Sequence, residues 1–243
     1  MKAALHFLAG AMLLAAASAQ AQTAAAQTAP AQTAPAQTAA AGAAYLVTYI
    51  EVGAASAGRA ATVLRRLAAA GRRADGNRGF LALREHARPG RFALVEAWRD
   101  KAALDAHAAA EQAAFAALQP ILASPPDLRL CTGLDLSGGG AAEPGAKGTV
   151  YVLTHVDVVP SAKDEAIGLV KAVAAASRQQ DGNLRYDVYQ QGNRPNHMTV
   201  FEAWQDRTAH DAHVTAEATR QYRGKLLPLA GALYDERLYE AVR

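Results

Sequence analysis

The chain has 243 residues, of which 51% are hydrophobic and 19% are charged, with 25 basic and 22 acidic side chains. This near balance leaves no electrostatic footprint for nucleic acid binding. The single cysteine, Cys131, excludes a disulfide within the chain, and we expect it to be packed in an alternating apolar run. No apolar segment is long enough to span a membrane.

The N-terminal residues predict a secretory signal peptide over residues 1–21. Lys2 supplies a positive start, Ala3–Ala17 form an apolar stretch, and the small residues that follow offer a cleavage site. Residues 22–44 repeat Ala-Gln-Thr-Ala-Pro without charges or large apolar side chains, which predicts a disordered linker. We therefore expect a periplasmic or secreted protein.

The rest of the chain contains two copies of one structural unit, offset by 106 residues. The matching motifs are Glu96-Ala97-Trp98 with Glu202-Ala203-Trp204, Asp105-Ala106-His107 with Asp211-Ala212-His213, and Asp75-Gly76-Asn77 with Asp181-Gly182-Asn183. The offset holds without a gap from Tyr45 to Ala117, as expected for a duplicated domain. The predicted domains span residues 45–136 and 149–243, joined by a Gly/Ala-rich linker over 137–148.

Each copy predicts the element order strand, helix, strand, strand, helix, strand, because apolar residues alternate in the strands and recur every three or four residues in the helices. In copy one the expected elements are a strand over 45–52, a helix carrying Val63, Leu64 and Leu67, strands over 80–86 and 92–98, a helix capped by Asp100 and ending near Leu118, and a strand over 128–136. Copy two repeats this order and ends with a strand over 233–242. Asp-Gly-Asn ends each first helix.

This order defines an α+β fold built from ferredoxin-like βαββαβ units. Such a unit places its helices on one face of a four-stranded antiparallel sheet and leaves the other face uncovered. Two such sheets in one chain can bury each other. We therefore expect an internal pseudo-dimer, an intramolecular dimeric α+β barrel with the helices outside, while assembly into a higher homo-oligomer stays open.

One face of the second helix carries the candidate functional residues. In copy one this stripe comprises Leu104, His107, Glu111, Phe115 and Leu118, and in copy two it comprises His210, His213 and Glu217. A buried His and Glu one turn apart must be paired or hydrogen-bonded. Two interpretations remain open: a core His that links helix to sheet, or a His that lines a pocket between them. We expect pocket behaviour more strongly at His213, because copy two is more polar along this helix.

The chain also resembles a known family. Glu-x-Trp, a capping Asp, and a His on the following helix, within a βαββαβ unit, resemble the antibiotic biosynthesis monooxygenase domain. The matching residues are Glu96, Trp98, Asp100, Leu104 and His107 in copy one, and Glu202, Trp204, Asp206 and His213 in copy two, with Gly182, Arg185 and Tyr186 before them. The resemblance implies a dimeric α+β barrel and a cofactor-free oxygenase for quinols or polycyclic phenols.

By this resemblance, the substrates are a small aromatic molecule and O2, and no cofactor is needed. The implied catalytic residues are His107 or His213 as base, oriented by Glu111 or Glu217, and the implied substrate-binding residues are Tyr49, His155, Trp98, Trp204, Glu96 and Glu202. The alternative function is a non-catalytic small-molecule-binding or stress-associated barrel. Haem degradation is disfavoured, because neither first strand carries the Asn that haem-degrading relatives use.

Copy two also offers a possible metal site. His210, His213 and Glu217 fall on one helical face, and His155 lies on the first strand. Three nitrogens and a carboxylate would suit zinc or iron. Copy one has Leu104 in place of His210, so this set is not shared by the two copies.

Overall fold

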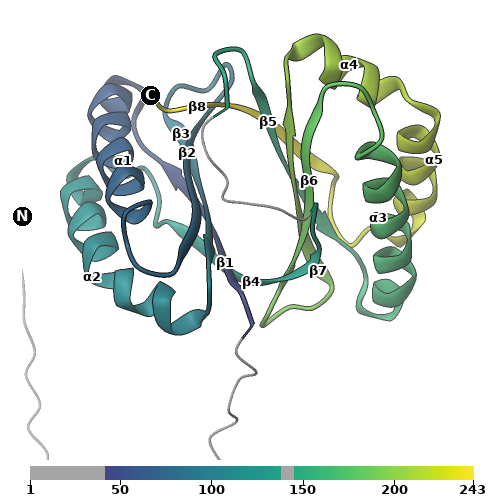
Figure 1. Ribbon diagram of the computed structural model, residues 1–243, viewed down its shortest axis with the longest axis horizontal. Helices are drawn as coiled ribbons and strands as arrows, with labels where there is room; N and C mark the ends of the chain where they lie inside the picture. The colour runs from purple at the N-terminus through teal and green to yellow at the C-terminus, as the bar shows by residue number, and fades with distance from the viewer. Residues whose placement is uncertain (1–41, 138–144) are drawn as a thin grey trace, which may run out of the picture. The chain divides into compact units, whose positions relative to one another are not determined.

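The computed structural model describes residues 42–137 and 145–243 (Figure 1). The expected signal peptide and most of the linker over 22–44 lie outside the described residues. Within the two described ranges, no helix is long and apolar enough to cross a membrane.

Each copy folds into the predicted order of helices and strands. Copy one contains β1 (Ala44–Glu51), α1 (Ala57–Gly71), β2 (Asn77–Glu85), β3 (Arg91–Trp98), α2 (Lys101–Leu118) and β4 (Asp127–Asp135). Copy two contains β5 (Val150–Asp157), α3 (Lys163–Ser177), β6 (Asn183–Gln191), β7 (His197–Trp204), α4 (Arg207–Thr215), α5 (Glu217–Leu226) and β8 (Asp235–Ala241). The 3₁₀ turns η1 to η4 are Ala54–Ser56, Gln119–Ile121, Pro160–Ala162 and Leu227–Leu229.

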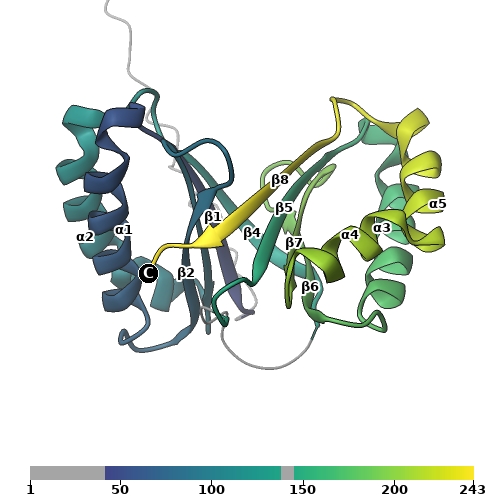
Figure 2. The same cartoon turned by 90° about the horizontal axis from the view of Figure 1, so that it is seen from above.

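The strands close into one barrel in the order β1-β3-β2-β8-β5-β7-β6-β4. The last strand of each copy bridges the two sheets. β4 pairs with β1 of its own copy and with β6 of copy two, and β8 pairs with β5 and with β2 of copy one. Figure 2 shows β8 running between β2 and β5. The predicted internal pseudo-dimer is confirmed, and pairing of each last strand with a strand of the other copy closes its barrel.

The barrel interior is filled by side chains from both copies. Because alternate residues of a strand face opposite sides, Tyr45 and Val47 point inward while Leu46 and Ile50 face α1 and α2. The rings of Tyr45 and Tyr189 stack across the interior with centroids 4.7 Å apart. The free Cys131 is also buried there, as the alternation of its strand predicts.

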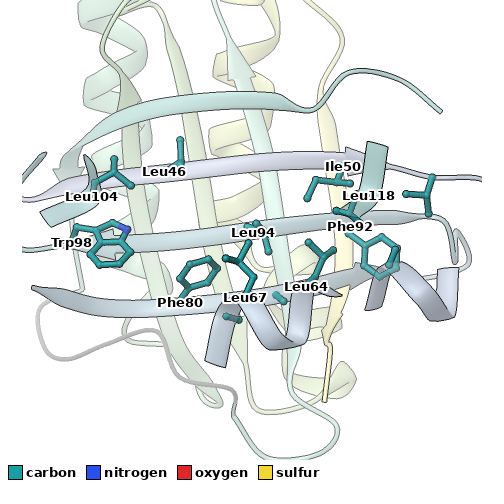
Figure 3. Packing of buried hydrophobic residues seen from close by; sticks show 14 of the residues in the cluster. Leu46, Ile50, Leu64, Leu67, Phe80, Phe92, Leu94, Trp98, Leu104 and Leu118 are labelled. Carbon is teal, nitrogen blue, oxygen red and sulfur yellow. The ribbon is translucent and has the colours of Figure 1, made fainter. Parts of the chain in front are cut away.

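A second hydrophobic layer lies between the helices and the outer face of each sheet (Figure 1). In copy one, Leu64 and Leu67 of α1 and Leu104 of α2 pack against Phe80 and Trp98 of the sheet (Figure 3). The predicted helical stripe is therefore a buried face, and His107 belongs to it with 7% of its surface exposed.

The predicted caps and turns set where each second helix begins. Asp100 Oδ1 accepts a hydrogen bond from the backbone N–H of Ala103 at 2.8 Å, and Asp206 Oδ1 caps α4 in the same way. Gly76 and Gly182 both have φ of 75°. A Cβ at Gly76 would stand 2.5 Å from the Cβ of Ala103, so only glycine lets this turn pack against the start of α2.

The second helix of copy two is broken, so the predicted repeat does not hold along its whole length. Ala216 has ψ of 144°, which ends α4 and starts α5. Beyond this break, equivalent positions lie 108 residues apart. The two helices end at Leu118 and Leu226, and both of these leucines are buried. Copy two thus has two extra residues, and the gapless offset of 106 to Ala117 is wrong. Thr219, not Glu217, stands where copy one has Glu111.

Copy one expressed alone, as residues 45–136, should dimerise or aggregate. Without copy two, β2 and β4 lose their partner strands β8 and β6, and the inward sheet face is exposed. Analytical ultracentrifugation of this fragment beside the full chain measures the outcome. A stable monomeric fragment would contradict the dependence of one copy on the other.

Candidate functional site

Both copies bury a Glu, a Trp and a His between sheet and second helix. Trp98 Nε1 donates to Glu96 Oε2 at 3.0 Å, and in copy two the corresponding bond of Trp204 to Glu202 is 2.8 Å. The Glu and Trp lie two residues apart on a strand, so both face the helix. The ring centroids of His107 and Trp98 are 5.0 Å apart. Each copy thus presents the same three side chains in one arrangement.

In copy two, His213 is held by partners on both ring nitrogens. Nδ1 lies 2.8 Å from Gln180 Oε1 and 3.3 Å from Thr219 Oγ1. Because an amide oxygen only accepts hydrogen bonds, Nδ1 carries the proton. Nε2 is therefore unprotonated and can accept a hydrogen bond. Nε2 lies 3.5 Å from Glu202 Oε2, at the outer limit of a hydrogen bond.

Burial keeps this pair neutral. Burial, followed by the charges of His210 and Arg223, lowers the pKa of His213 to about 4. Burial also raises the pKa of Glu202 to about 8, against the opposing hydrogen bond from Trp204. At neutral pH a protonated Glu202 therefore faces a neutral imidazole, and the contact is not an ion pair.

In copy one, the corresponding groups are only partly satisfied: Glu96 keeps the bond from Trp98 through Oε2, but other atoms of the cluster lack a partner. Glu96 Oε1, Glu111 Oε1 and His107 Nε2 are buried without a hydrogen bond. Burial, and next the charge of Glu111, raises the pKa of Glu96 well above its ordinary value, and burial raises that of Glu111 and lowers that of His107. Buried polar atoms are nearly always satisfied. This cluster therefore has hydrogen-bonding capacity for a ligand or water.

A cavity of about 340 Å³ lies at the start of α2, and His107 is the residue of this cluster that lines it. It is lined by His107 together with Asp75, Arg99 and Asp100. The geometry thus favours His107 as the pocket-lining histidine, whereas we expected His213. The physical reason is that copy two places Gln180 and Thr219 against its histidine, where copy one has Ala74 and Glu111.

The structure separates the other predicted substrate-binding residues from this cluster. Tyr49 packs against the barrel interior, with the guanidinium carbon of Arg129 4.8 Å from its ring centroid. His155 Nε2 lies 3.3 Å from His197 Nδ1. Trp98 and Trp204 lie in the helix–sheet layers instead. Tyr49 and His155 therefore do not form walls around His107 or His213.

Glu217 does not face the sheet, contrary to the predicted stripe. It is exposed at the start of α5 and bonds to Arg220 and Gln221, because the break at Ala216 turns it outward. The possible metal set of His155, His210, His213 and Glu217 is consequently not brought together. No group of three or more His, Cys, Asp or Glu in the described ranges could hold a metal ion.

Two features of the site were missed from the sequence. The carboxyl pair of Glu96 and Glu111 forms because a strand and a helix meet, which no local pattern shows. Gln180 and Thr219, which fix His213, were also missed. The replacement of Ala74 by Gln180 beside an otherwise repeated Asp-Gly-Asn motif was the available signal.

Comparisons with known proteins agree with this architecture. The model of the family described as antibiotic biosynthesis monooxygenase matches residues 43–117 and 149–225, more than half of the chain. The "uncharacterized protein sll1783" of Synechocystis is 32% identical over 69 residues, which are 28% of this chain and 47% of that protein. This chain thus spans about half of that relative's length. The "putative monooxygenase YcnE" of Bacillus subtilis is 23% identical over 64 residues, 26% of this chain and 67% of that protein.

Solved structures share the fold over most of the chain. A "putative monooxygenase" of Fusobacterium nucleatum aligns with a TM-score of 0.73 and 16% identity, over 84% of this chain and 94% of that one. A "putative monooxygenase" of Lactobacillus acidophilus aligns with a TM-score of 0.69 and 13% identity, over 83% and 95%. At these identities the likeness establishes the fold alone.

The neutral pair in copy two predicts how stability depends on pH. The pKa of Glu202 is raised from 4.5 to about 8, so its contribution to stability is lost as pH rises through this window. The pKa of His213 is lowered from 6.5 to about 4, which acts in the opposite direction up to pH 6.5. The His213 effect is complete only about one pH unit above 6.5, so between pH 6.5 and 8 the pair should lower the free energy of unfolding by roughly 1–2 kcal/mol.

Denaturant unfolding of the Glu202→Gln variant at pH 6.5 and 8 tests this expectation. The variant keeps the side-chain shape but cannot titrate, so the fall between the two pH values should be smaller than in the wild type by roughly 1–2 kcal/mol, and only the contribution of other groups such as Glu96 and Glu111 should remain. The exposed Glu240→Gln serves as the matched control and should keep the fall. An unchanged fall in Glu202→Gln would contradict the protonated state of Glu202.

Proposed function

The chain belongs to the antibiotic biosynthesis monooxygenase family, and we propose that it oxygenates a small aromatic or quinol substrate with O2, without a cofactor. The observation that carries this proposal is His107, whose unpaired Nε2 lies in the helix–sheet layer beside a cavity of about 340 Å³. A volume of this order suits a small ring system. The resemblance to the putative monooxygenase YcnE and to two solved structures of putative monooxygenases supports the reaction class.

His107 is the proposed base. Burial lowers its pKa, so the imidazole is neutral at physiological pH and Nε2 can accept the proton of a substrate hydroxyl. The deprotonated substrate supplies the electrons: one atom of O2 enters the ring system and the other leaves as water. The protein must therefore deprotonate the substrate and exclude bulk water rather than provide redox chemistry.

Glu96 and Glu111 are the proposed partners of the substrate anion. Their raised pKa values favour a protonated carboxyl, which can donate a hydrogen bond to the substrate oxygen after its proton has moved to His107. Trp98 holds Glu96 through its indole N–H and packs beside the imidazole. In copy two the same frame is internally satisfied, which favours a structural role for His213 and Glu202.

Replacing His107 with Asn should lower quinol turnover by roughly 100-fold or more, the usual contribution of a general base. The melting temperature should change little, because Nε2 makes no hydrogen bond in the free protein. Oxygen consumption with a panel of quinols, without added flavin, haem or metal, measures the effect. Full turnover by the variant would refute the assignment of His107.

His213→Asn is the matched control in copy two. It loses the bonds of His213 to Gln180 and Thr219, so it should lose roughly 1–3 kcal/mol of stability while keeping turnover. The alternative function, a non-catalytic small-molecule-binding or stress-associated barrel, predicts binding of quinols without oxygen consumption in the wild-type chain as well.

We also propose that the protein is exported to the periplasm or secreted. Residues 1–21 carry the support, with Lys2 followed by the apolar run Ala3–Ala17 and small residues at the cleavage region. Fusing residues 1–44 to a reporter enzyme that is active only after export should give activity, and changing Leu13 and Leu14 to Asp should abolish it. Retention of the first fusion in the cytoplasm would refute export.

A further inference from the structure

Copy two contains a second cavity that the proposed active site does not use. Its volume is about 760 Å³, and it lies between the end of β5 and the segment from α5 to Tyr234. Its lining is mainly apolar, including Val156, Leu226 and Ala230. At its rim Leu227 and Leu233 are 73% and 93% exposed. An apolar cavity with an exposed apolar rim is typical of a small-molecule site.

This cavity reaches the end of β7 opposite Trp204, although Arg223 on its lining is close enough for its charge to act on His213 and Glu202. His197, which contacts the cavity residue His155, begins β7, and Trp204 ends it. Seven residues of extended strand separate them, or about 23 Å at about 3.3 Å per residue. The cavity belongs to copy two and shares no lining residue with the cavity beside His107, so its role does not depend on the proposed oxygenase function.

A chain of three polar side chains reaches the cavity wall. Asp157 Oδ1 lies 3.3 Å from His197 Nε2, and His197 Nδ1 lies 3.3 Å from His155 Nε2. Both Asp157 and His155 line the cavity. The nearby Asp157 carboxylate favours the neutral tautomer of His197 with its proton on Nε2, and in this tautomer Nδ1 of His197 accepts the Nε2 proton of His155. This order leaves Nδ1 of His155 as a hydrogen-bond acceptor without a protein partner among the described residues.

The electrostatics keep this acceptor available. Burial, together with the charges of Arg129 and His197, lowers the pKa of His155 to about 4, and burial lowers that of His197. On the same cavity lining, Arg223 is paired with Glu236, and the Tyr234 hydroxyl donates to Glu236 at 3.2 Å. The polar groups that remain are the acceptors His155 Nδ1 and the Asp157 carboxylate, together with Nε of Arg223, a buried donor without a hydrogen bond.

The arrangement is specific to copy two. The positions of His155, Asp157 and His197 correspond to Tyr49, Glu51 and Arg91 at an offset of 106. In copy one, Arg91 and Glu51 form an ion pair at 3.2 Å, so these positions hold no histidine chain that presents an acceptor. The fold therefore does not require the Asp-His-His chain.

The geometry points to a second small-molecule site in copy two, which binds an apolar molecule carrying a hydroxyl or N–H group that donates to His155. The apolar walls exclude water from this bond, and the Asp157–His197 pair fixes the tautomer of His155 that accepts it. A ligand with an acceptor in place of the donor would bind more weakly, because its lone pair would face the lone pair of His155.

Fluorescence titration of the full chain with hydroxypyrene and methoxypyrene tests this site. The two probes share one ring system, but only the first has a donor. Hydroxypyrene should bind about tenfold more tightly, the difference expected for one hydrogen bond in a partly dry site. His155→Phe should remove this tenfold advantage and leave methoxypyrene binding unchanged. Quinol turnover should also stay unchanged, which separates this site from the proposed active site.

Two controls keep the experiment decisive. The exposed His86→Phe should leave the binding of both probes as in the wild type. Gly224 lines the cavity and a Cβ there meets nothing within 4 Å, so Gly224→Phe should fold and weaken both probes by filling the cavity. Gly168→Phe, equally open but in α3, should not. Equal affinity of the two probes for the wild type, or equal binding by both glycine variants, would overturn the proposal.

Discussion

Pairing of the last strand of each copy with a strand of the other copy is the interaction on which the rest of the structure depends. β4 and β8 each pair with a strand of the other copy, and these two pairings turn two open sheets into one closed barrel. Open edges with an exposed apolar face would be prone to association. Closure also fixes which face of every strand looks inward, so that the opposite face is left for the helices.

The helix–sheet layers show how a duplicated frame can carry two different clusters. Both copies keep the Glu–Trp hydrogen bond and the His that packs on the Trp ring. In copy two, Gln180 and Thr219 satisfy the ring nitrogen that faces them. In copy one, the corresponding cluster keeps buried polar atoms without partners. The cluster of copy two is thus held by hydrogen bonds, whereas copy one departs from the rule that buried polar atoms are satisfied. Such departures are typical of functional sites.

The same division holds at the other end of the strands, with the copies reversed. Copy one closes that end with the ion pair of Arg91 and Glu51, whereas copy two carries the Asp157–His197–His155 chain beside an apolar cavity. Because the two copies share one barrel, the hydrophobic core formed by both copies stabilises the fold when one copy carries polar residues at this end of its strands. This shared core makes such divergence tolerable.

The sequence by itself determined the features that depend on neighbouring residues. Alternation and helical spacing predicted the strands, the first helices and the buried stripe with His107 and His213, because side-chain direction follows backbone period. The helix cap at Asp100 and the turn at Gly76 could be predicted because both depend only on residues near them in the chain. Only the tertiary structure decided the rest: the helix break that turns Glu217 to solvent, the placement of Thr219 against His213, and the protonation of Glu96 and Glu202. These depend on burial and on contacts between segments distant in the chain, which a linear pattern does not encode.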